Sequence, residues 1–359
     1  MTGLIIVESP NKAKKIAKLY PSMTVKATVG HFRDLPVNEM GVEPPEHQPQ
    51  YVVDPDKENV LAAIRKAANS SDTIWIAADP DREGEAIAWH TQFCLGKKHA
   101  SKCKRITFTE VNKRAIDKAM SSPRSIDYAQ VRAQEARRVV DRYVGYLVSP
   151  ALKKKLIASK GAVEGARISA GRVQSVAVKL LVELEGSIAN FQPIEHFGVR
   201  AHMEHGGVSF WADWDFKVLP DFPDGERLWK DRVTADFVAE SATQLELIDA
   251  VDVTKNNKPL PPLTTSDLVK SANRLYRFST KKAMDLAQKL FEVGLITYHR
   301  TDSPTMSDDF VSTLRHFATA NGYAVPEQSR VYRAAGNSQE GHECCRVTDI
   351  ENSQPPEIS

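Results

Sequence analysis

The sequence TIWIAADPDREGEAIAW occupies residues 73–89 and joins an apolar run to an acidic turn and a second apolar segment. The first run, residues 73–78, is typical of a strand that is covered on both faces of a parallel sheet. The residues after Glu85 have the composition of a helix. We therefore predict a strand, a turn and a helix, with three carboxylates where the strand ends.

The amino terminus repeats this arrangement. Residues 4–7 form a wholly apolar run, Glu8 follows at once, and residues 12–19 show helical spacing behind Pro10. Strands that alternate with helices predict an α/β layer architecture for about residues 1–125.

The remainder of the chain has different patterns. Residues 130–180 read as helical and hold eleven Lys and Arg against three acidic residues. Alternating apolar residues on either side of Gly206 and Gly207 predict a β-hairpin with one wet face. Prolines at 259–262 indicate a domain boundary, after which Thr264 and Ser279 are expected to cap two helices.

Composition limits the class of protein. Apolar residues make up 42% of the 359 residues and charged residues 26%, which is typical of a globular, water-soluble chain. There is no apolar run long enough to cross a membrane and no signal-like amino terminus, so we expect a cytoplasmic protein. The four cysteines lack two-residue spacing, so we expect no structural zinc.

The acidic turn is the strongest candidate site. Asp79 and Asp81 point to one side if the segment is extended, and Glu83 can reach the same point from the first helical turn. Hard carboxylate oxygens suit Mg²⁺. The alternative is a solvated acidic turn at a helix amino terminus. Glu8 favours the metal site, because open α/β sheets bind ligands at the carboxyl ends of their strands. Lys12 could meet a phosphate there, although it could also belong to a solvated basic face.

A series of motifs carries a family resemblance. In chain order they are LIIVESPNKAKKI, GHFRDLP, DPDREGEAIAWH, RRVVDRYVGYLVSP, SAGRVQSVAVKLL, PLTTSDLV and GLITYHRTDS. From residue 4 to about residue 346 the chain resembles a type IA DNA topoisomerase, closer to bacterial topoisomerase III, including plasmid-borne forms, than to other members. Near residues 342–346 it departs from the family, because Cys344 and Cys345 replace the usual Ala and Ile.

The resemblance implies a role for particular residues. Tyr298 matches the nucleophile that forms a 5′-phosphotyrosine bond, although a tyrosine in an apolar stretch is by itself more often a core residue. The matching residues are Tyr298, Glu8, Lys12, Arg300 and His342 for catalysis, and Asp79, Asp81, Glu83 and Glu8 for the metal. Mg²⁺ is the implied cofactor, without zinc. No ATP is expected, because the covalent bond conserves the energy of the cut and the sequence has no Walker motif.

The basic segment fits a groove for DNA, either single-stranded or underwound duplex. The residues that could bind DNA are Arg132, Arg137, Arg138, Arg142, Arg167, Arg172, Gln174 and His31. The alternative for this segment is ordinary surface charge.

The resemblance also implies the organisation of the fold. We expect a Toprim α/β domain at residues 1–125 with an excursion at about 37–63, a basic helical DNA-binding segment at 126–191, the first part of a β arch at 192–258, a helical tyrosine-bearing domain at 259–350, and a disordered tail at 351–359. Because family members continue well past the last motif and this chain ends at Ser359, we expect an incomplete type IA toroid, from either an amino-terminal piece or a shortened gene product.

Three functions remain open on this basis. The first is an ATP-independent topoisomerase that relaxes negative supercoils or decatenates DNA. The second is a DNA-binding remnant of such an enzyme that does not turn over. The third is a Toprim primase or nuclease, which the motif around Tyr298 argues against.

Overall fold

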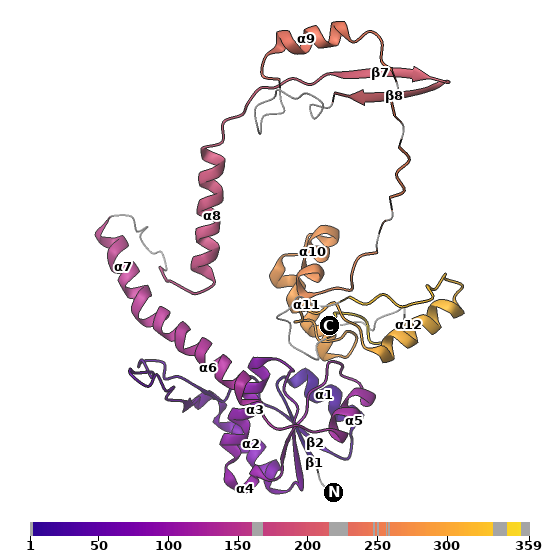
Figure 1. Ribbon diagram of the computed structural model, residues 1–359. Helices are drawn as coiled ribbons and strands as arrows, with labels where there is room; N and C mark the ends of the chain where they lie inside the picture. The colour runs from indigo at the N-terminus through magenta and orange to yellow at the C-terminus, as the bar shows by residue number, and fades with distance from the viewer. Residues whose placement is uncertain are drawn as a thin grey trace. The chain divides into compact units, whose positions relative to one another are not determined.

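A computed structural model describes residues 3–159, 168–214, 229–246, 248–249, 251–255, 257, 259–332 and 343–352 (Figure 1). The chain divides into two compact units. The first is formed by Met1–Arg172 together with Pro259–Ser359, and the second by Val173–Lys258. The first unit therefore combines the two ends of the sequence.

A four-stranded parallel sheet lies at the centre of the first unit. Its strands, in spatial order, are β2 (Thr24–Ala27), β1 (Gly3–Val7), β5 (Thr73–Ile76) and β6 (Cys103–Arg105). All five residues of β1 are buried, as predicted for a strand that is covered on both faces. The chain leaves β1 for β2 on one side and returns to β5 on the other, so the strand order reverses between β1 and β5. Such a reversal opens a crevice at the carboxyl ends of the two strands.

Helices cover both faces of this sheet. They are α1 (Pro10–Leu19), α2 (Glu58–Asn69), α3 (Arg82–Leu95), α4 (Lys97–Ala100) and α5 (Lys113–Ser121), with a short 3₁₀ turn at Pro55–Lys57. Leu4 and Ile6 pack in one core cluster with residues of α2 and α3, whereas Ile5 and Val7 pack in the other with residues of α1 and α5. Burial of each such side chain contributes about 1.5–3 kcal/mol to stability.

Two further elements of the first unit flank the sheet. A two-stranded ribbon pairs β3 (Arg33–Asp34) with β4 (Val52–Val53). Helix α6 (Tyr128–Tyr143) packs against α3 and continues through a π-helical turn (Val144–Val148) into α7 (Ser149–Ala158). Within the described residues of the first unit, these helices confirm the prediction that residues 130–180 are mostly helical.

The tyrosine-bearing segment, residues 259–332 and 343–352, completes the first unit. Its helices are α10 (Thr265–Tyr276), α11 (Thr280–Glu292) and α12 (Asp308–Ala320). Thr264 forms a capping box with Asp267, and Ser279 caps α11, as predicted. Gly294 has a φ of +79°, and a Cβ there would lie 2.5 Å from the carbonyl oxygen of Val111, so only glycine fits where this turn approaches the loop between β6 and α5.

The second unit contains α8 (Gln174–Ala189), the strands β7 (Arg200–His205) and β8 (Val208–Asp213), and α9 (Arg232–Ser241). The predicted hairpin is confirmed, with Gly206 and Gly207 at positive φ in its turn. Its predicted buried face is not formed among the described residues of this unit, because the two strands pair only with each other and most of their residues are exposed.

All four cysteines are free thiols. No helix in the described part is long and apolar enough to span a bilayer.

Candidate active site

The ends of β1 and β5 bring the first group of predicted residues together. Glu8 follows β1, and its Oε1 atom accepts a hydrogen bond from the backbone N–H of Asp79 at 2.6 Å. Lys12, in the first turns of α1, is buried and its ammonium group binds the Asp79 carboxylate. The crevice where the strand order reverses therefore holds Glu8, Lys12 and Asp79, as expected from their places after neighbouring strands.

Gly84 allows α3 to begin against this crevice. A Cβ at Gly84 would lie 2.2 Å from the carbonyl oxygen of Asp79 and 2.8 Å from Oε1 of Glu8. Any other residue would push the helix away from the acidic loop. The sequence interpretation missed this position, although a glycine inside an acidic helix start was a signal for close approach.

The three carboxylates of the acidic turn do not meet at one point, contrary to the prediction. Asp81 caps α3 by accepting from the N–H of Gly84 at 2.8 Å. Helix α3 then turns Glu83 toward α6, where its Oε2 atom lies 3.1 Å from Nε2 of Gln134 and 3.5 Å from Nε2 of His31. Among the described residues, no three His, Cys, Asp or Glu side chains are close enough together to hold one metal ion directly.

The electrostatics of the crevice nevertheless suit a cation. Burial, followed by the charge of Asp79, raises the pKa of Glu8 to about 7, although Lys12 opposes the shift. A raised carboxylate pKa means that unneutralised negative charge is costly there. Glu8, Asp79 and Asp81 offer the hard oxygen atoms that Mg²⁺ prefers. The chemistry of these donors therefore fits the implied metal, although in this state Lys12 binds Asp79 and the hydroxyl of Tyr298 binds Asp81.

Tyr298 lies against the same crevice, although it is 217 residues from Asp81 along the chain. Its side chain is 2% exposed and packs edge-on against Phe291, with ring centroids 5.2 Å apart. Its hydroxyl donates to Oδ2 of Asp81 at 2.5 Å, and its backbone N–H donates to the carbonyl of Thr109 at 2.8 Å. Burial, and then the charges of Asp79 and Asp81, raise the pKa of Tyr298 well above its ordinary range. The phenol is therefore neutral in this state.

The neighbours of Tyr298 differ in exposure. His299 is buried, and burial together with Arg300 lowers its pKa to about 4, so its ring is neutral at pH 7. Arg300 is exposed, and its positive charge opposes the rise in the pKa of Tyr298. His342 lies outside the described residues.

The predicted DNA-binding residues fall into several groups. Arg137 and His31 line a cavity of about 290 Å³ together with Glu83 and Gln134. Arg138 binds Asp34 at 2.5 Å, and Arg172 binds Asp141 at 3.0 Å.

Arg142 is buried and donates to the carbonyls of Pro36 and Glu39. Gln174 belongs to the second unit, and Arg167 lies outside the described residues. The phosphate contacts of these groups stay a prediction.

Buried ion pairs around Arg105 hold the backbone of the acidic loop in place. The sequence interpretation did not identify them. Arg105 at the end of β6 donates to the carbonyls of Ala78 and Asp79 at 2.7 and 2.8 Å and to Oε2 of Glu85 at 3.1 Å. Glu85 also accepts from Arg124 at 2.6 Å. The Arg105 guanidinium thus fixes the backbone that carries the first carboxylate. Nothing in the local sequence marks Arg105, because its partners come from other elements.

The buried side chain of His90 is expected to make the folding stability of the protein depend on pH. It is buried beside the rings of Tyr51 and Trp89, and burial together with Arg33 and His31 lowers its pKa to about 3, with Asp34 opposing. Because the unfolded chain takes up a proton near pH 6.5 and the folded chain does not, this group destabilises the fold as pH falls below 6.5. Between pH 7 and pH 5.5 its contribution is expected to be about 1.3 kcal/mol.

Urea unfolding of the protein and of His90→Phe at these two pH values measures this contribution. The variant should lose less stability on acidification than the unchanged protein. Equal losses would show that His90 is not held neutral.

Comparison with known families gives two matches, which together cover most of the chain. Residues 3–111 match the Toprim domain, and residues 125–358 match the family described as DNA topoisomerase. The first match covers the sheet with its acidic loop, and the second covers α6 onward and includes Tyr298.

Individual relatives agree with these matches. The chain is 38% identical to a protein named DNA topoisomerase I, plasmid, from Xylella fastidiosa, over 99% of this chain and 52% of the relative. It is 36% identical to DNA topoisomerase 1 of Escherichia coli, over 97% of this chain and 43% of that protein. The solved structure of full-length topoisomerase I from Thermotoga maritima superimposes with a TM-score of 0.76 at 33% identity, covering 97% of this chain and 55% of that one.

Two facts follow from these relatives. The chain spans about half the length of the curated relatives it matches. The relatives are named topoisomerase I, so they do not support the predicted closeness to topoisomerase III.

Proposed function

This chain belongs to the type IA DNA topoisomerase family, and we propose that it supplies the cleavage and rejoining centre for one DNA strand, with Tyr298 as the nucleophile. The observation that carries the proposal is the hydrogen bond from the Tyr298 hydroxyl to Asp81, beside the group formed by Lys12, Asp79 and Glu8. A buried tyrosine hydroxyl commonly finds an acceptor, as that of Tyr20 does in Asp117. Tyr298 differs because its acceptor belongs to the acidic loop at the carboxyl end of the sheet.

In the proposed reaction the Oη atom of Tyr298 attacks phosphorus in the DNA backbone. A bond forms between Oη and phosphorus, and the bond from phosphorus to the 3′ oxygen breaks. The phenol proton moves toward Asp81, which already accepts its hydrogen bond. The leaving 3′ oxygen takes a proton from Lys12 or Glu8. One ester replaces another, so rejoining is the reverse attack and needs no ATP.

Other groups bind and orient the strand. Arg300 is exposed, and its planar guanidinium would contact the phosphate. We assign Glu8, Asp79 and Asp81, with Glu83 as an outlying carboxylate, as the residues that would hold Mg²⁺. When bound, this ion would supply positive charge that lowers repulsion during rejoining. His342 is proposed as a further catalytic group.

The rest of the chain is assigned in the same way. We infer that the basic helical segment at residues 126–191 binds single-stranded DNA, with phosphate contacts from Arg137 and its neighbours. Residues 192–258 would be the first part of a β arch, and residues 259–350 the tyrosine domain of the family toroid. The activity would be relaxation of negative supercoils or decatenation in the bacterial cytoplasm, where such DNA lies.

A labelled single-stranded oligonucleotide tests the proposal. After incubation with the protein and Mg²⁺ and rapid denaturation, a label at the 3′ end should stay with the protein and a label at the 5′ end should be released. No adduct, or an adduct that retains the 5′ label instead, would overturn the assignment. An adduct without relaxation of supercoiled plasmid would favour the second candidate, a chain that cuts DNA but does not complete strand passage.

A further inference from the structure

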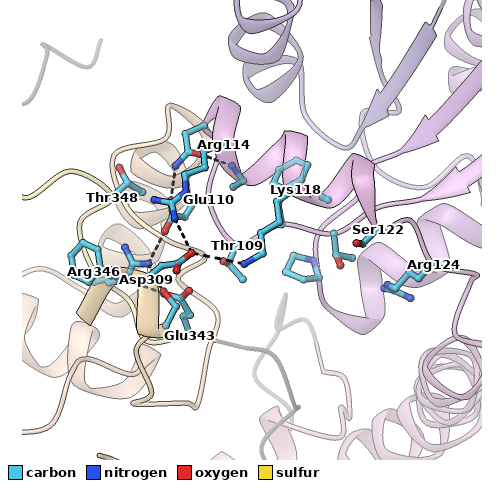
Figure 2. A pocket seen from close by; sticks show the side chains of 18 of the residues that line it. Thr109, Glu110, Arg114, Lys118, Ser122, Arg124, Asp309, Glu343, Arg346 and Thr348 are labelled. Carbon is cyan, nitrogen blue, oxygen red and sulfur yellow. Dashed lines mark hydrogen bonds and ion pairs between the residues drawn. The ribbon is translucent and has the colours of Figure 1, made fainter. Parts of the chain in front are cut away.

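A second, larger cavity adjoins the reacting centre. It has a volume of about 850 Å³ and is lined by residues of α5 and of the tyrosine-bearing segment (Figure 2). Gln130 of α6 also lines it. Its wall includes Pro80, which sits between the two aspartates of the acidic loop, and Thr109, whose carbonyl holds the backbone of Tyr298. Part of the cavity wall is therefore formed by direct neighbours of the proposed reacting residues.

The acidic loop lies between this cavity and the smaller one. Pro80 lines the larger cavity, whereas Glu83 lines the smaller. Helix α6 repeats the arrangement, because Gln130 lines the larger cavity and Gln134, about one turn later, lines the smaller. When the reacting phosphate of a DNA strand lies at the acidic loop, the nucleotides on one side of that phosphate point toward the larger cavity. The nucleotides on its other side, the other flank, point toward the smaller cavity.

We propose that the larger cavity receives the flank of the DNA strand that becomes linked to Tyr298, with Arg114 and Lys118 as its phosphate contacts. This inference rests on the proposed function. Its wall includes residues of α12 and of residues 343–348, which belong to the tyrosine-bearing segment, whereas the smaller cavity is lined only by residues before 142. A fragment bonded to Tyr298 has to stay with the segment that carries Tyr298, so its binding residues belong on that side.

Arg114 and Lys118, two cations of the larger cavity, are paired with a carboxylate that a phosphate could replace. Arg114 and Lys118 project from α5 toward one carboxylate, Asp309, at 2.8 and 3.9 Å (Figure 2). Their side chains are 75% and 80% exposed and that of Asp309 is 59% exposed, so these ion pairs are weak and screened by salt. Asp309 thus competes with a DNA phosphate for binding to Arg114 and Lys118.

A third cation of the wall is fixed in place instead. Arg346 is buried, binds Glu110 and Glu343 at 2.6 Å each, and stacks on the ring of Phe310 at 3.7 Å. With two carboxylates and an aromatic ring as partners, it holds α12 and the sheet side together. The fourth cation of the wall, Arg124, is bound to the buried Glu85 at 2.6 Å, so the exchange with phosphate concerns Arg114 and Lys118.

Asp309→Asn is the sharpest test, because it removes the competing carboxylate and is expected to strengthen binding. Two oligonucleotides are used whose cleavage position has been mapped from the adduct. One extends about six nucleotides beyond the cut on the tyrosine-linked side, and the other extends only one. Fluorescence anisotropy without Mg²⁺ should show the variant binding the long oligonucleotide about 3–10-fold more tightly at low salt, with a steeper salt dependence and little change for the short one.

Matched variants control this measurement. Asp285→Asn removes the partner of Lys281 from a pair of similar geometry, at 2.9 Å with the aspartate side chain 60% exposed, and should change neither affinity. Arg114→Gln together with Lys118→Gln should weaken the long oligonucleotide selectively, which keeps the test valid if Asp309→Asn disturbs α12.

Equal effects on both oligonucleotides, or no effect of either set of variants, would overturn the assignment of the cavity while an adduct still formed. Absence of any adduct would instead overturn the proposed function, and this inference with it.

Discussion

Tyr298→Phe is expected to abolish the covalent protein–DNA adduct, a loss of at least ~10⁴-fold, because phenylalanine has no oxygen that can attack phosphorus. Binding of the same oligonucleotide should change little, since the side chain is buried and the exposed cations are unaltered. The measurement is adduct yield after denaturation, with anisotropy as the readout for binding.

Tyr20→Phe is the matched control for that variant. The hydroxyl of Tyr20 also donates to a carboxylate, Asp117, at 2.6 Å, and burial raises its pKa as well. Yet Tyr20 is the cap residue at the carboxyl end of α1, and its acceptor belongs to α5 and not to the acidic loop, so its replacement should leave adduct formation intact. An adduct that survives in Tyr298→Phe, or vanishes in Tyr20→Phe, would contradict the assigned role of Tyr298.

Glu85→Gln is expected to lower the free energy of unfolding by roughly 3–5 kcal/mol, because it leaves the buried Arg105 guanidinium without its counter-charge. Glu85 is fully buried and binds Arg105, Arg124 and the backbone N–H of Asp127. Burial alone would raise the pKa of Glu85, but the two guanidinium groups and this N–H outweigh it and keep the pKa below its ordinary value.

Chemical denaturation measures the loss in Glu85→Gln, and the exposed pair variant Asp285→Asn, expected to lose less than about 1 kcal/mol, is the reference. Because Arg105 also holds the carbonyls of Ala78 and Asp79, adduct yield should fall in Glu85→Gln at temperatures where it remains folded. A change in stability as small as that of the reference would show that the network does not support the loop.

Local patterns made much of the fold predictable. The strand that includes residues 4–7, the hairpin turn at Gly206 and Gly207, and the caps at Thr264 and Ser279 each depend on a few neighbouring residues. Periodicity, turn chemistry and capping act over that range, so the sequence alone indicates them.

Contacts between distant residues could not be predicted in the same way. Glu83 was expected beside Asp79 and Asp81, but the start of α3 turns it toward Gln134, 51 residues away. Arg105 and Glu85 are separated by 20 residues and meet only because β6 and α3 pack together. The motif around Tyr298 indicated a nucleophile, whereas its bond to Asp81 depends on how the two ends of the chain pack.

The central claim is that DNA becomes bonded to Tyr298, and peptide mass spectrometry of the trapped adduct tests it most directly. Trypsin should release the peptide LFEVGLITYHR, residues 290–300, in which Tyr298 is the single tyrosine. After nuclease trimming, we expect this peptide to carry a nucleotide through a 5′ phosphate on Tyr298. A nucleotide on any other residue, or its attachment to Tyr298 through a 3′ phosphate, would contradict the account.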